Sequence, residues 1–588
     1  MSLITRFRRT PGLDMPVDTP PDDVTATVIA EADAPDAAPV PGPRSTGGAG
    51  RARLRTAAGW MVTLLAAVLV LGALLSPNQV SSLGPAAFLR IPLEALIAVA
   101  VLRLLPRRPR TVLAAVLGAL LGLLLIVKLV DMGFYTTLSR SFDLVLDWPF
   151  FADAYNIVQG NTNTAVAWLV LIGVVLLAVG VLALTAAATI RLSGFVVRHD
   201  RASVRTVAVL TVIWVLIAGT GLRADPGGPV AAWSTARMAA DKVRQINTGL
   251  ADSREFAELA ANDAFRDVPP ERLLTGLAGK DFFLTFIESY GRTAVEGPDY
   301  TGPVTTALDA GEERLTAAGF SARSGWLTSP TAGGGSWLAH STLQSGLWID
   351  NQQRYRNLVS TEHTTLTGAF QRADWRTVGI MPALTYAWPE QHFYGFDQVY
   401  DSTTIGYEGE HFTWVVVPDQ FSYSALQRRE LDVHDGPVMA EIDTLSSHSP
   451  WTKLPRMVDW TAVGDGTIFT PQARAGVPTR ELWSNSDRVR AAYRQSIEYS
   501  IEALTSWIAT YGTDDTVVVF LGDHQPAPII TGDGASRDVP ITIVAKDPAV
   551  LDRVASWEWT PGLKPAPDAP VWRMDSFRDR FLTTFSDL

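Results

Sequence analysis

Thr516-Val-Val-Val-Phe-Leu-Gly-Asp523-His524-Gln-Pro is the stretch that decides the fold of the second half of the chain. Its apolar, valine-rich part predicts a buried strand, which Leu-Gly ends. A carboxylate and an imidazole follow at once. In open α/β sheets ligands bind beyond the carboxyl ends of the strands, and Asp and His are common ligands of divalent metals. The stretch therefore predicts a metal site at the edge of a sheet.

Two further stretches fit the same plan. Residues 281–291 contain a second apolar strand, and this strand ends on a carboxylate, Glu288. Residues 329–340 place three glycines directly before Ser336, at an expected helix start. Glycines let a phosphate approach the backbone N–H groups closely, and a helix N-terminus favours negative charge. The second stretch therefore predicts another metal ligand, and the third predicts a hydroxyl beside a phosphate site.

Taken together, the three stretches predict one catalytic centre. Two carboxylates and an imidazole suit Mn²⁺, Mg²⁺ or Zn²⁺. A hydroxyl bound to such a metal loses its proton more readily, for the reason that metal-bound water does. The set predicts a metal-activated serine, Ser336, that attacks phosphorus and becomes phosphorylated. The predicted metal ligands are Glu288, Ser336, Asp523 and His524.

Composition separates the chain into an apolar part and an acidic part. The chain has 588 residues and a mean hydropathy of +0.13, which is too apolar for a wholly soluble protein. It contains no cysteine, so disulfides, thiolate zinc sites and cysteine nucleophiles are excluded. Residues 1–223 carry a net charge of +6, whereas the remainder carries −17. The acidic second part argues against nucleic acid as a partner.

The apolar part predicts a membrane domain. Residues 1–55, rich in Pro, Asp, Ala and Thr, predict a disordered cytoplasmic tail. Residues 56–222 predict a transmembrane domain of five helices, because each apolar segment approaches the ~20 residues that cross a bilayer. The segments are 57–76, 84–105, 111–130, 165–188 and 206–222.

The charges flanking these segments predict an orientation. Arginines precede the first segment and lie between the second and third and between the fourth and fifth, so the N-terminus is expected in the cytoplasm. An odd number of spans then puts the rest of the chain outside. The second segment is the weakest, because it carries Arg90, Pro92 and Glu94, and it is alternatively re-entrant.

The remaining sequence predicts a connector and a catalytic domain. Residues 223–278 have few helix breakers and predict a helical juxtamembrane connector. In residues 279–588 apolar strand patterns alternate with helical patterns. This alternation predicts an extracytoplasmic α/β domain with a mostly parallel sheet sandwiched by helices.

The order of the motifs resembles the alkaline phosphatase/sulfatase superfamily, and most closely its membrane branch with lipoteichoic acid synthase and the phosphoglycerol transferases. The resemblance implies an alkaline-phosphatase-like fold, and it implies that Glu288 is the first metal-binding glutamate. Ser336 falls where the family has its nucleophile, usually a threonine. Asp523 and His524 match the paired metal ligands, and His448 in Leu-Ser-Ser-His-Ser-Pro-Trp matches a histidine near the substrate phosphate.

Three further residues stand near the expected substrate. Trp388 resembles a pocket tryptophan of that branch, and the polymerases place an arginine two residues later. This chain has Glu390 there, and a carboxylate repels a phosphate rather than clamping it. His340, four residues after Ser336, shares its helix face and is either a phosphate contact or a packed side chain.

The resemblance implies a metal-dependent transferase in the cell membrane. It would move a phosphorylated head group, phosphoglycerol or similar, from a membrane phospholipid to an extracytoplasmic cell-envelope glycan or polymer. One divalent ion is expected, Mn²⁺ first and Mg²⁺ or Zn²⁺ as alternatives. A hydrolase using water as acceptor is the alternative, and a non-catalytic membrane scaffold is the third hypothesis. The oligomeric state has no sequence signal.

Overall fold

The computed structural model describes residues 47–588, except 139, 221, 226–227, 233, 386–387 and 414–415. The chain divides into two compact units, Met1–Trp60 and Met61–Leu588. Most of the predicted tail, residues 1–46, lies outside the described residues. The last residues of that tail belong to helix α1 (Gly47–Leu75).

The described part of the chain contains four helices that are long and apolar enough to cross a membrane. They are Thr56–Leu75 of α1, Arg107–Leu138 (α3), Thr164–Arg198 (α5) and Asp200–Thr220 (α6). The prediction of five helices is therefore wrong. In the second predicted segment, 3₁₀ turns precede Pro92, and helix α2 (Leu93–Leu104) has only 12 residues. At 1.5 Å per residue these cover ~18 Å of the ~30 Å hydrocarbon core.

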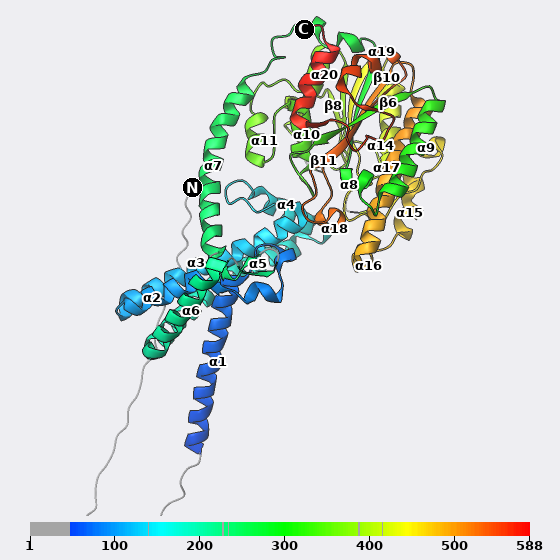
Figure 1. Cartoon of the computed structure of the whole chain (residues 1–588). Coiled ribbons are helices and arrows are strands. Elements are labelled where there is room, and N and C mark those ends of the chain that lie inside the picture. Colours follow the sequence, from blue (N-terminus) through cyan, green and yellow to red (C-terminus); the bar gives the residue numbers. More distant parts are fainter. Residues whose placement is uncertain are drawn as a thin grey trace, which may run out of the picture. The chain divides into compact units, whose positions relative to one another are not determined.

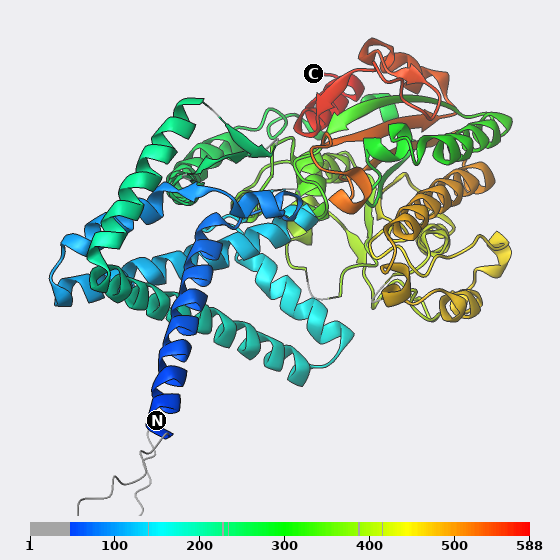
Figure 2. The same cartoon turned by 60° about the horizontal axis from the view of Figure 1, so that its bottom comes forward.

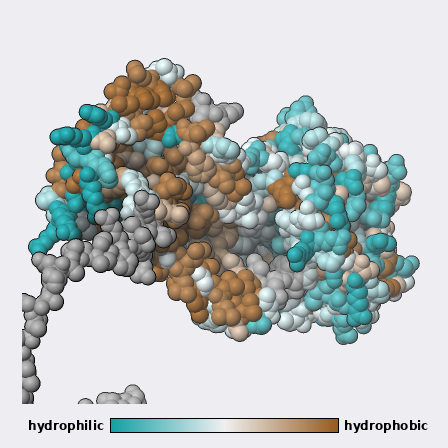
Figure 3. Space-filling view, turned by 90° about the horizontal axis from the view of Figure 1, so that it is seen from below, coloured by the Kyte–Doolittle hydropathy of each residue, from teal (hydrophilic) through white to brown (hydrophobic). Residues whose placement is uncertain are grey.

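The change in span number removes one argument about orientation, because an even number of crossings does not carry the chain to the far side. The surface still separates the two parts of the chain by character. Apolar surface gathers over the candidate spans, while the surface of the α/β domain is mainly hydrophilic (Figure 3). Whatever the direction of crossing, these long apolar helices suit a membrane and the domain suits water.

Helix α7 (Ser234–Ala261) occupies the middle of the predicted connector, after the short strands β2 (Arg223–Asp225), β3 (Gly228–Pro229) and β4 (Ala231–Ala232). Buried ion pairing ties α7 to α3. Lys242 Nζ lies 3.1 Å from Asp131 Oδ1, and both side chains are buried. A buried charge is costly unless it is paired, so this pair holds the start of the connector against the membrane helices.

The α/β domain is built on a nine-stranded sheet. Its spatial order is β12-β6-β11-β10-β5-β9-β7-β8, with β13 paired to β6. From β10 to β8 neighbouring strands are parallel, as predicted, but β11 runs antiparallel to both of its neighbours, so the sheet is mixed. The strands are β5 (Asp281–Ile287), β6 (Ser321–Thr328), β7 (Arg376–Ile380), β8 (Gln398–Tyr400), β9 (Val438–Asp443), β10 (Thr516–Gly522), β11 (Asp538–Ala545), β12 (Thr560–Pro561) and β13 (Val571–Arg573).

Helices cover both faces of this sheet (Figures 1 and 2). Val517, Val519 and Leu521 of β10 pack on one face, toward α10 (Ser336–Ser345), α12 (Leu366–Arg372) and α20 (Phe577–Phe585). Val518 and Phe520 pack on the other face, toward α9 (Thr301–Ala317), α14 (Asp419–Leu426) and α17 (Ser486–Tyr511). Both faces of β10 are buried, which explains why residues 517–521 form an unbroken apolar run.

The strand register brings the predicted site together. β10 and β5 are parallel neighbours, and Gly522 pairs with Ile287 at their last shared position. The residues that follow each strand therefore emerge side by side at one edge of the sheet. β9 is the parallel neighbour of β5 on its other side, so three strands end at this edge.

Candidate active site

Two carboxylates meet where β5 and β10 end. Asp523 follows Gly522, and Glu288 follows Ile287 on the neighbouring strand. The backbone N–H of Ser289 donates to Asp523 Oδ1 at 2.7 Å, and Ser289 Oγ donates to Glu288 Oε1 at 2.8 Å. Ser289 adopts a left-handed φ of 57°, which turns the chain so that both of these bonds form. The turn after β5 thus fixes both carboxylates.

The loop before α10 is held against the end of β10. Ser329 Oγ donates to the backbone oxygen of Asp523 at 2.7 Å, and the N–H of Gly333 donates to the oxygen of Gln525 at 2.7 Å. Gly333, Gly334 and Gly335 have φ values of 74°, 150° and 81°, in the region that glycine adopts without steric cost. The glycines therefore permit the turn that places the first residue of α10 over the carboxylates.

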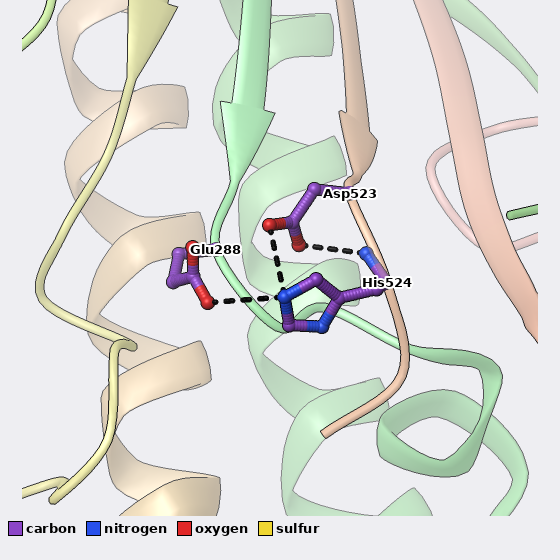
Figure 4. Close-up of side chains that lie close together, drawn as sticks. All are labelled: Glu288, Asp523 and His524. Atoms are coloured by element: carbon purple, nitrogen blue, oxygen red, sulfur yellow. Dashed lines mark hydrogen bonds and ion pairs between the residues drawn. The ribbon is translucent and has the colours of Figure 1, made fainter. Parts of the chain in front are cut away.

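Ser336 is that first residue, and its hydroxyl points into the cluster. Ser336 Oγ lies 3.0 Å from Glu288 Oε2 and 3.2 Å from His524 Nε2. His524 Nε2 in turn lies 3.5 Å from Glu288 Oε1 and 3.4 Å from Asp523 Oδ2 (Figure 4). All four predicted metal ligands are brought together, from strand ends and a helix start far apart in the sequence.

The donor set fits a divalent metal ion. His524 Nδ1 lies 2.9 Å from the backbone oxygen of Gln525, which only accepts, so Nδ1 carries the proton and Nε2 presents a lone pair to the cluster. Asp523 Oδ2 is a buried atom without a hydrogen-bond partner in the described structure. Two ligands ~2.1 Å from a tetrahedral ion lie ~3.4 Å apart, close to the His524–carboxylate separations of 3.4 and 3.5 Å.

Burial and neighbouring charges perturb the site residues. Burial, reinforced by Glu288, raises the pKa of Asp523 to about 6. Burial also raises the pKa of Glu288, but His448 and His524 outweigh this effect, so its pKa lies below the usual value. Burial lowers the pKa of His524, and the two carboxylates reverse that shift. Two buried carboxylates beside one imidazole leave excess negative charge, which a divalent cation would neutralise.

His448 lies at the margin of the cluster. It follows the turn after β9, where Ser447 Oγ donates to the backbone oxygen of Glu288 at 2.6 Å. His448 therefore adjoins a residue bonded to Glu288, and it follows β9, which lies on the opposite side of β5 from β10. This place agrees with the predicted role near a substrate phosphate, which remains a prediction.

Trp388 and His340 have different surroundings. Trp388 packs against Tyr394, with ring centroids 5.1 Å apart, and Tyr394 Oη lies 2.6 Å from Ser341 Oγ of α10. Trp388 thus belongs to an aromatic cluster beside α10 rather than to the metal ligands. His340 stacks on Phe286 at 3.9 Å, facing the sheet.

The sequence interpretation missed two carboxylates near His340. His340 Nδ1 lies 3.5 Å from Asp443 Oδ2 and 3.8 Å from Glu441 Oε1, and both acids come from β9. The signal was available: Glu441 and Asp443 are two apart in an apolar run, so they face the same side of a strand. Charged side chains facing a covered side of a sheet are unusual.

A family model and several solved structures are similar to this chain. Residues 310–535 match the family model described as Sulfatase. The matched range includes Ser336, His448, Asp523 and His524 and begins after Glu288. The predicted resemblance to the alkaline phosphatase/sulfatase superfamily is confirmed. No match is found among the curated proteins.

Three of the solved structures similar to this chain come from bacteria. The lipoteichoic acid synthase LtaP of Listeria monocytogenes is 15% identical, with 49% of this chain and 71% of that chain covered and a TM-score of 0.32. The Streptococcus pyogenes phosphoglycerol transferase GacH, in complex with sn-glycerol-1-phosphate, is 13% identical (57% and 89% covered, TM-score 0.34). The periplasmic domain of Escherichia coli EcEptC, in complex with Zn, is 14% identical (53% and 83% covered, TM-score 0.34).

Proposed function

We propose that this chain, residues 310–535 of which match the Sulfatase family model, is a metal-dependent membrane transferase that uses Ser336 as its nucleophile. It would move a phosphorylated head group, phosphoglycerol or similar, from a membrane lipid to a glycan or polymer of the cell envelope. The observation that carries the proposal is the position of Ser336 Oγ, 3.0 Å from Glu288 and 3.2 Å from His524 in one buried cluster. A serine that only begins a helix does not require a carboxylate and an imidazole within hydrogen-bond distance of its hydroxyl.

The residues suggest how the two steps proceed. A divalent ion bound by Glu288, Asp523 and His524 would favour the alkoxide of Ser336. As Oγ bonds to phosphorus, its proton passes to Glu288 Oε2, to which the hydroxyl already donates. The bond from phosphorus to the lipid alcohol breaks, and that alcohol leaves with a proton from water. In the second step an acceptor hydroxyl attacks the phosphoserine and gives its proton to the hydroxide that water left in the first step. The Oγ–phosphorus bond breaks, and Ser336 Oγ recovers its proton from Glu288 Oε2.

Other residues would serve the substrate. We assign His448 to the phosphate, because it is the imidazole beside Glu288 that is not part of the ligand set. Trp388 would line the path to the site from the aromatic cluster beside α10. Glu390, where the glycerol-phosphate polymerases have an arginine, indicates that the head group carries a polar or cationic end away from its phosphate.

We also propose that the domain lies outside the cytoplasm. The charges that flank the last two membrane helices, rather than the number of spans, indicate this orientation. Arg191 and Arg198 end α5, and Arg201 and Arg205 begin α6, so the junction of the two helices is strongly basic. The positive-inside rule puts this junction in the cytoplasm, and α6 then carries the chain out. With four spans the same orientation puts the N-terminus outside as well, against the cytoplasmic N-terminus expected from the sequence. The membrane anchor would raise the effective concentration of a lipid donor at the site.

A hydrolase is the second candidate, because the matched family is described as Sulfatase. The same Ser336 adduct forms in both cases, and only the acceptor differs. Water as acceptor would release the free phosphorylated head group. A glycan or polymer acceptor would retain it. The product therefore distinguishes the two reactions, and the adduct alone does not.

Intact mass spectrometry tests the nucleophile. The full chain in detergent is incubated with Mn²⁺, then separately with Mg²⁺ and Zn²⁺, and with a panel of anionic and zwitterionic phospholipids. We expect a mass increase of one head-group phosphate. It should vanish in Ser336→Ala and persist in Ser484→Ala, a matched change at an exposed serine.

The outcomes separate the hypotheses. An adduct that a cell-envelope glycan discharges into a modified glycan supports the transferase. An adduct that decays to free head-group phosphate, with or without glycan, supports the hydrolase. No adduct, no turnover of any lipid and no bound metal would reject both and leave the membrane scaffold.

A further inference from the structure

A second cluster of possible metal ligands lies behind the active site. It consists of His340 on α10 and of Glu441 and Asp443 on β9, with one ligand atom of each within 4.8 Å of the others. His340 follows Ser336 by four residues, about one helical turn or ~5.4 Å along α10. Asp443 pairs across the sheet with Phe286, two residues before Glu288. The cluster is therefore a neighbour of the active site but shares none of its ligands.

The separations are those of a metal site rather than of hydrogen bonds. His340 Nδ1 lies 3.5 Å from Asp443 Oδ2 and 3.8 Å from Glu441 Oε1. Both separations exceed the 2.7–3.2 Å range of N–H···O bonds. They are close to the ~3.4 Å expected between two ligands of one tetrahedral ion. The first site has the same pattern, since His524 Nε2 lies 3.4 and 3.5 Å from its carboxylates.

Asp443 also has an oxygen that nothing in the described structure satisfies. Its Oδ1 is buried and has no hydrogen-bond partner, as Asp523 Oδ2 has none in the first site. The only ion-pair partner of Glu441 and of Asp443 among the described residues is His340. Glu441 is 2% exposed, so water does not compensate its charge, and Gln344 Nε2, which donates to its Oε2, is uncharged. Two carboxylates in such a place need a cation or a proton.

We propose that His340, Glu441 and Asp443 bind a second divalent transition-metal ion, of the Zn²⁺ or Mn²⁺ kind, directly behind the nucleophile helix. The imidazole argues for a transition metal, because Mg²⁺ and Ca²⁺ prefer oxygen ligands throughout. The bound ion would tie α10 to β9 one turn behind Ser336. This proposal does not rest on the proposed reaction, because its readout is the number of ions bound.

The rival occupant is a proton. Burial raises the pKa of Glu441 to about 8, and burial together with Glu441 raises that of Asp443 well above its usual value. A carboxyl pair sharing protons beside a neutral His340 would relieve the same repulsion. The two possibilities differ in the number of metal ions bound. A second metal site predicts two ions per chain, whereas a carboxyl pair that shares protons predicts one.

Counting bound metal in the full chain decides between them. Tag-free protein in detergent is dialysed against buffered Zn²⁺, and separately Mn²⁺, and its metal content is measured by mass spectrometry. We expect two ions in the wild type, one in Asp443→Asn and one in Asp523→Asn, with none in the double variant. Glu502→Gln, a matched change at an exposed carboxylate, should keep two. Circular dichroism and a second variant, His340→Gln, distinguish a lost site from a lost fold.

Two results would overturn the proposal. One ion in the wild type, with no loss in folded Asp443→Asn, would leave the proton-sharing pair. Two ions in both the wild type and folded Asp443→Asn would place the second ion elsewhere. Loss of the serine adduct in the activity experiment would not bear on either result, so the two proposals fail separately.

Discussion

Replacing Gly522 with alanine should dismantle the active site without touching a ligand. A Cβ built on Gly522 would lie 2.7 Å from the carbonyl carbon of Tyr290, and closer still to its oxygen. Carbon atoms in contact are normally 3.5–4.0 Å apart. The backbone of Tyr290 follows the end of β5 and has no flexible end to move aside. The ends of β10 and β5 must therefore separate by about 1 Å.

That separation falls on the hydrogen bond that joins Asp523 to the turn after β5. The N–H of Ser289 donates to Asp523 Oδ1 at 2.7 Å, and about 1 Å more is outside the hydrogen-bond range. Overpacking costs about 1–3 kcal/mol, and a lost bond to a charged group about 1.5–3 kcal/mol. The sum, about 3–6 kcal/mol, is a large part of the ordinary stability of a domain. At roughly 2 °C per kcal/mol it lowers the unfolding temperature by roughly 6–12 °C.

The assay measures unfolding temperature and metal content of the full chain in detergent. Gly522→Ala should lose both stability and the ion held by Glu288, Asp523 and His524. The matched control is Gly302→Ala at an exposed position of α9, where the added Cβ meets nothing within 4 Å. It should retain the metal and be neutral or slightly stabilised. A Gly522→Ala protein with wild-type metal content and an unfolding temperature within about 1 °C would refute the reasoning.

Three further predictions concern the surroundings of the site. Asp419 is 0% exposed and accepts hydrogen bonds from the N–H groups of Leu445 (2.9 Å) and Ser446 (2.8 Å). Asp419→Ala should therefore lower the free energy of unfolding in denaturant by about 2–6 kcal/mol, and Asp419→Asn by clearly less. Equal losses in the two variants would contradict this prediction. Chelation of the metal by EDTA should lower the unfolding temperature, because an ion at a hundredfold excess over its Kd stabilises the folded protein by about 2.7 kcal/mol. An unchanged unfolding temperature would contradict a bound metal ion. Burial, followed by the charge of Arg578, lowers the pKa of His363 in the folded protein. The neutral His363 therefore contributes stability above about pH 6.5, the pKa of histidine in the unfolded chain, and this contribution is lost as the pH falls below that value. His363→Gln should therefore unfold with a smaller dependence on pH between about 7 and 5 than the wild type does, and identical pH profiles would rule the histidine out.

The site could be predicted from the sequence where local pattern and shared geometry coincide. Parallel strands buried on both faces need apolar residues at every position, and 516–521 and 282–287 are such runs. Polar side chains that bind a metal or a substrate are then expected just beyond the strand ends, at Glu288, Asp523 and His524. Neither step requires knowledge of which strands are neighbours, because parallel strands end at the same edge.

The parts that were wrong or missed depend on properties that a local pattern does not carry. Residues 84–105 are apolar enough to cross a membrane, but Pro92 has no N–H and limits the preceding residue, so helix begins only at Leu93. The direction of β11 was not predictable, because an apolar strand buried on both faces reads the same whether its neighbours are parallel or antiparallel. Glu441 and Asp443 were detectable as two acids on one side of an apolar strand, but only the fold shows that His340 of α10 lies beside them.

The position of the nucleophile shows why the catalytic constellation required the fold. Ser336 belongs to a different strand–helix unit from Asp523, and no spacing along the chain relates them. What relates them is that Ser329 and Gly333 donate hydrogen bonds to the backbone oxygens of Asp523 and Gln525. The loop bearing the nucleophile is thus fastened to the residues that hold the metal. A displacement of the end of β10 moves hydroxyl and ligands together, so substitutions there should lower metal affinity and adduct formation in parallel rather than one alone.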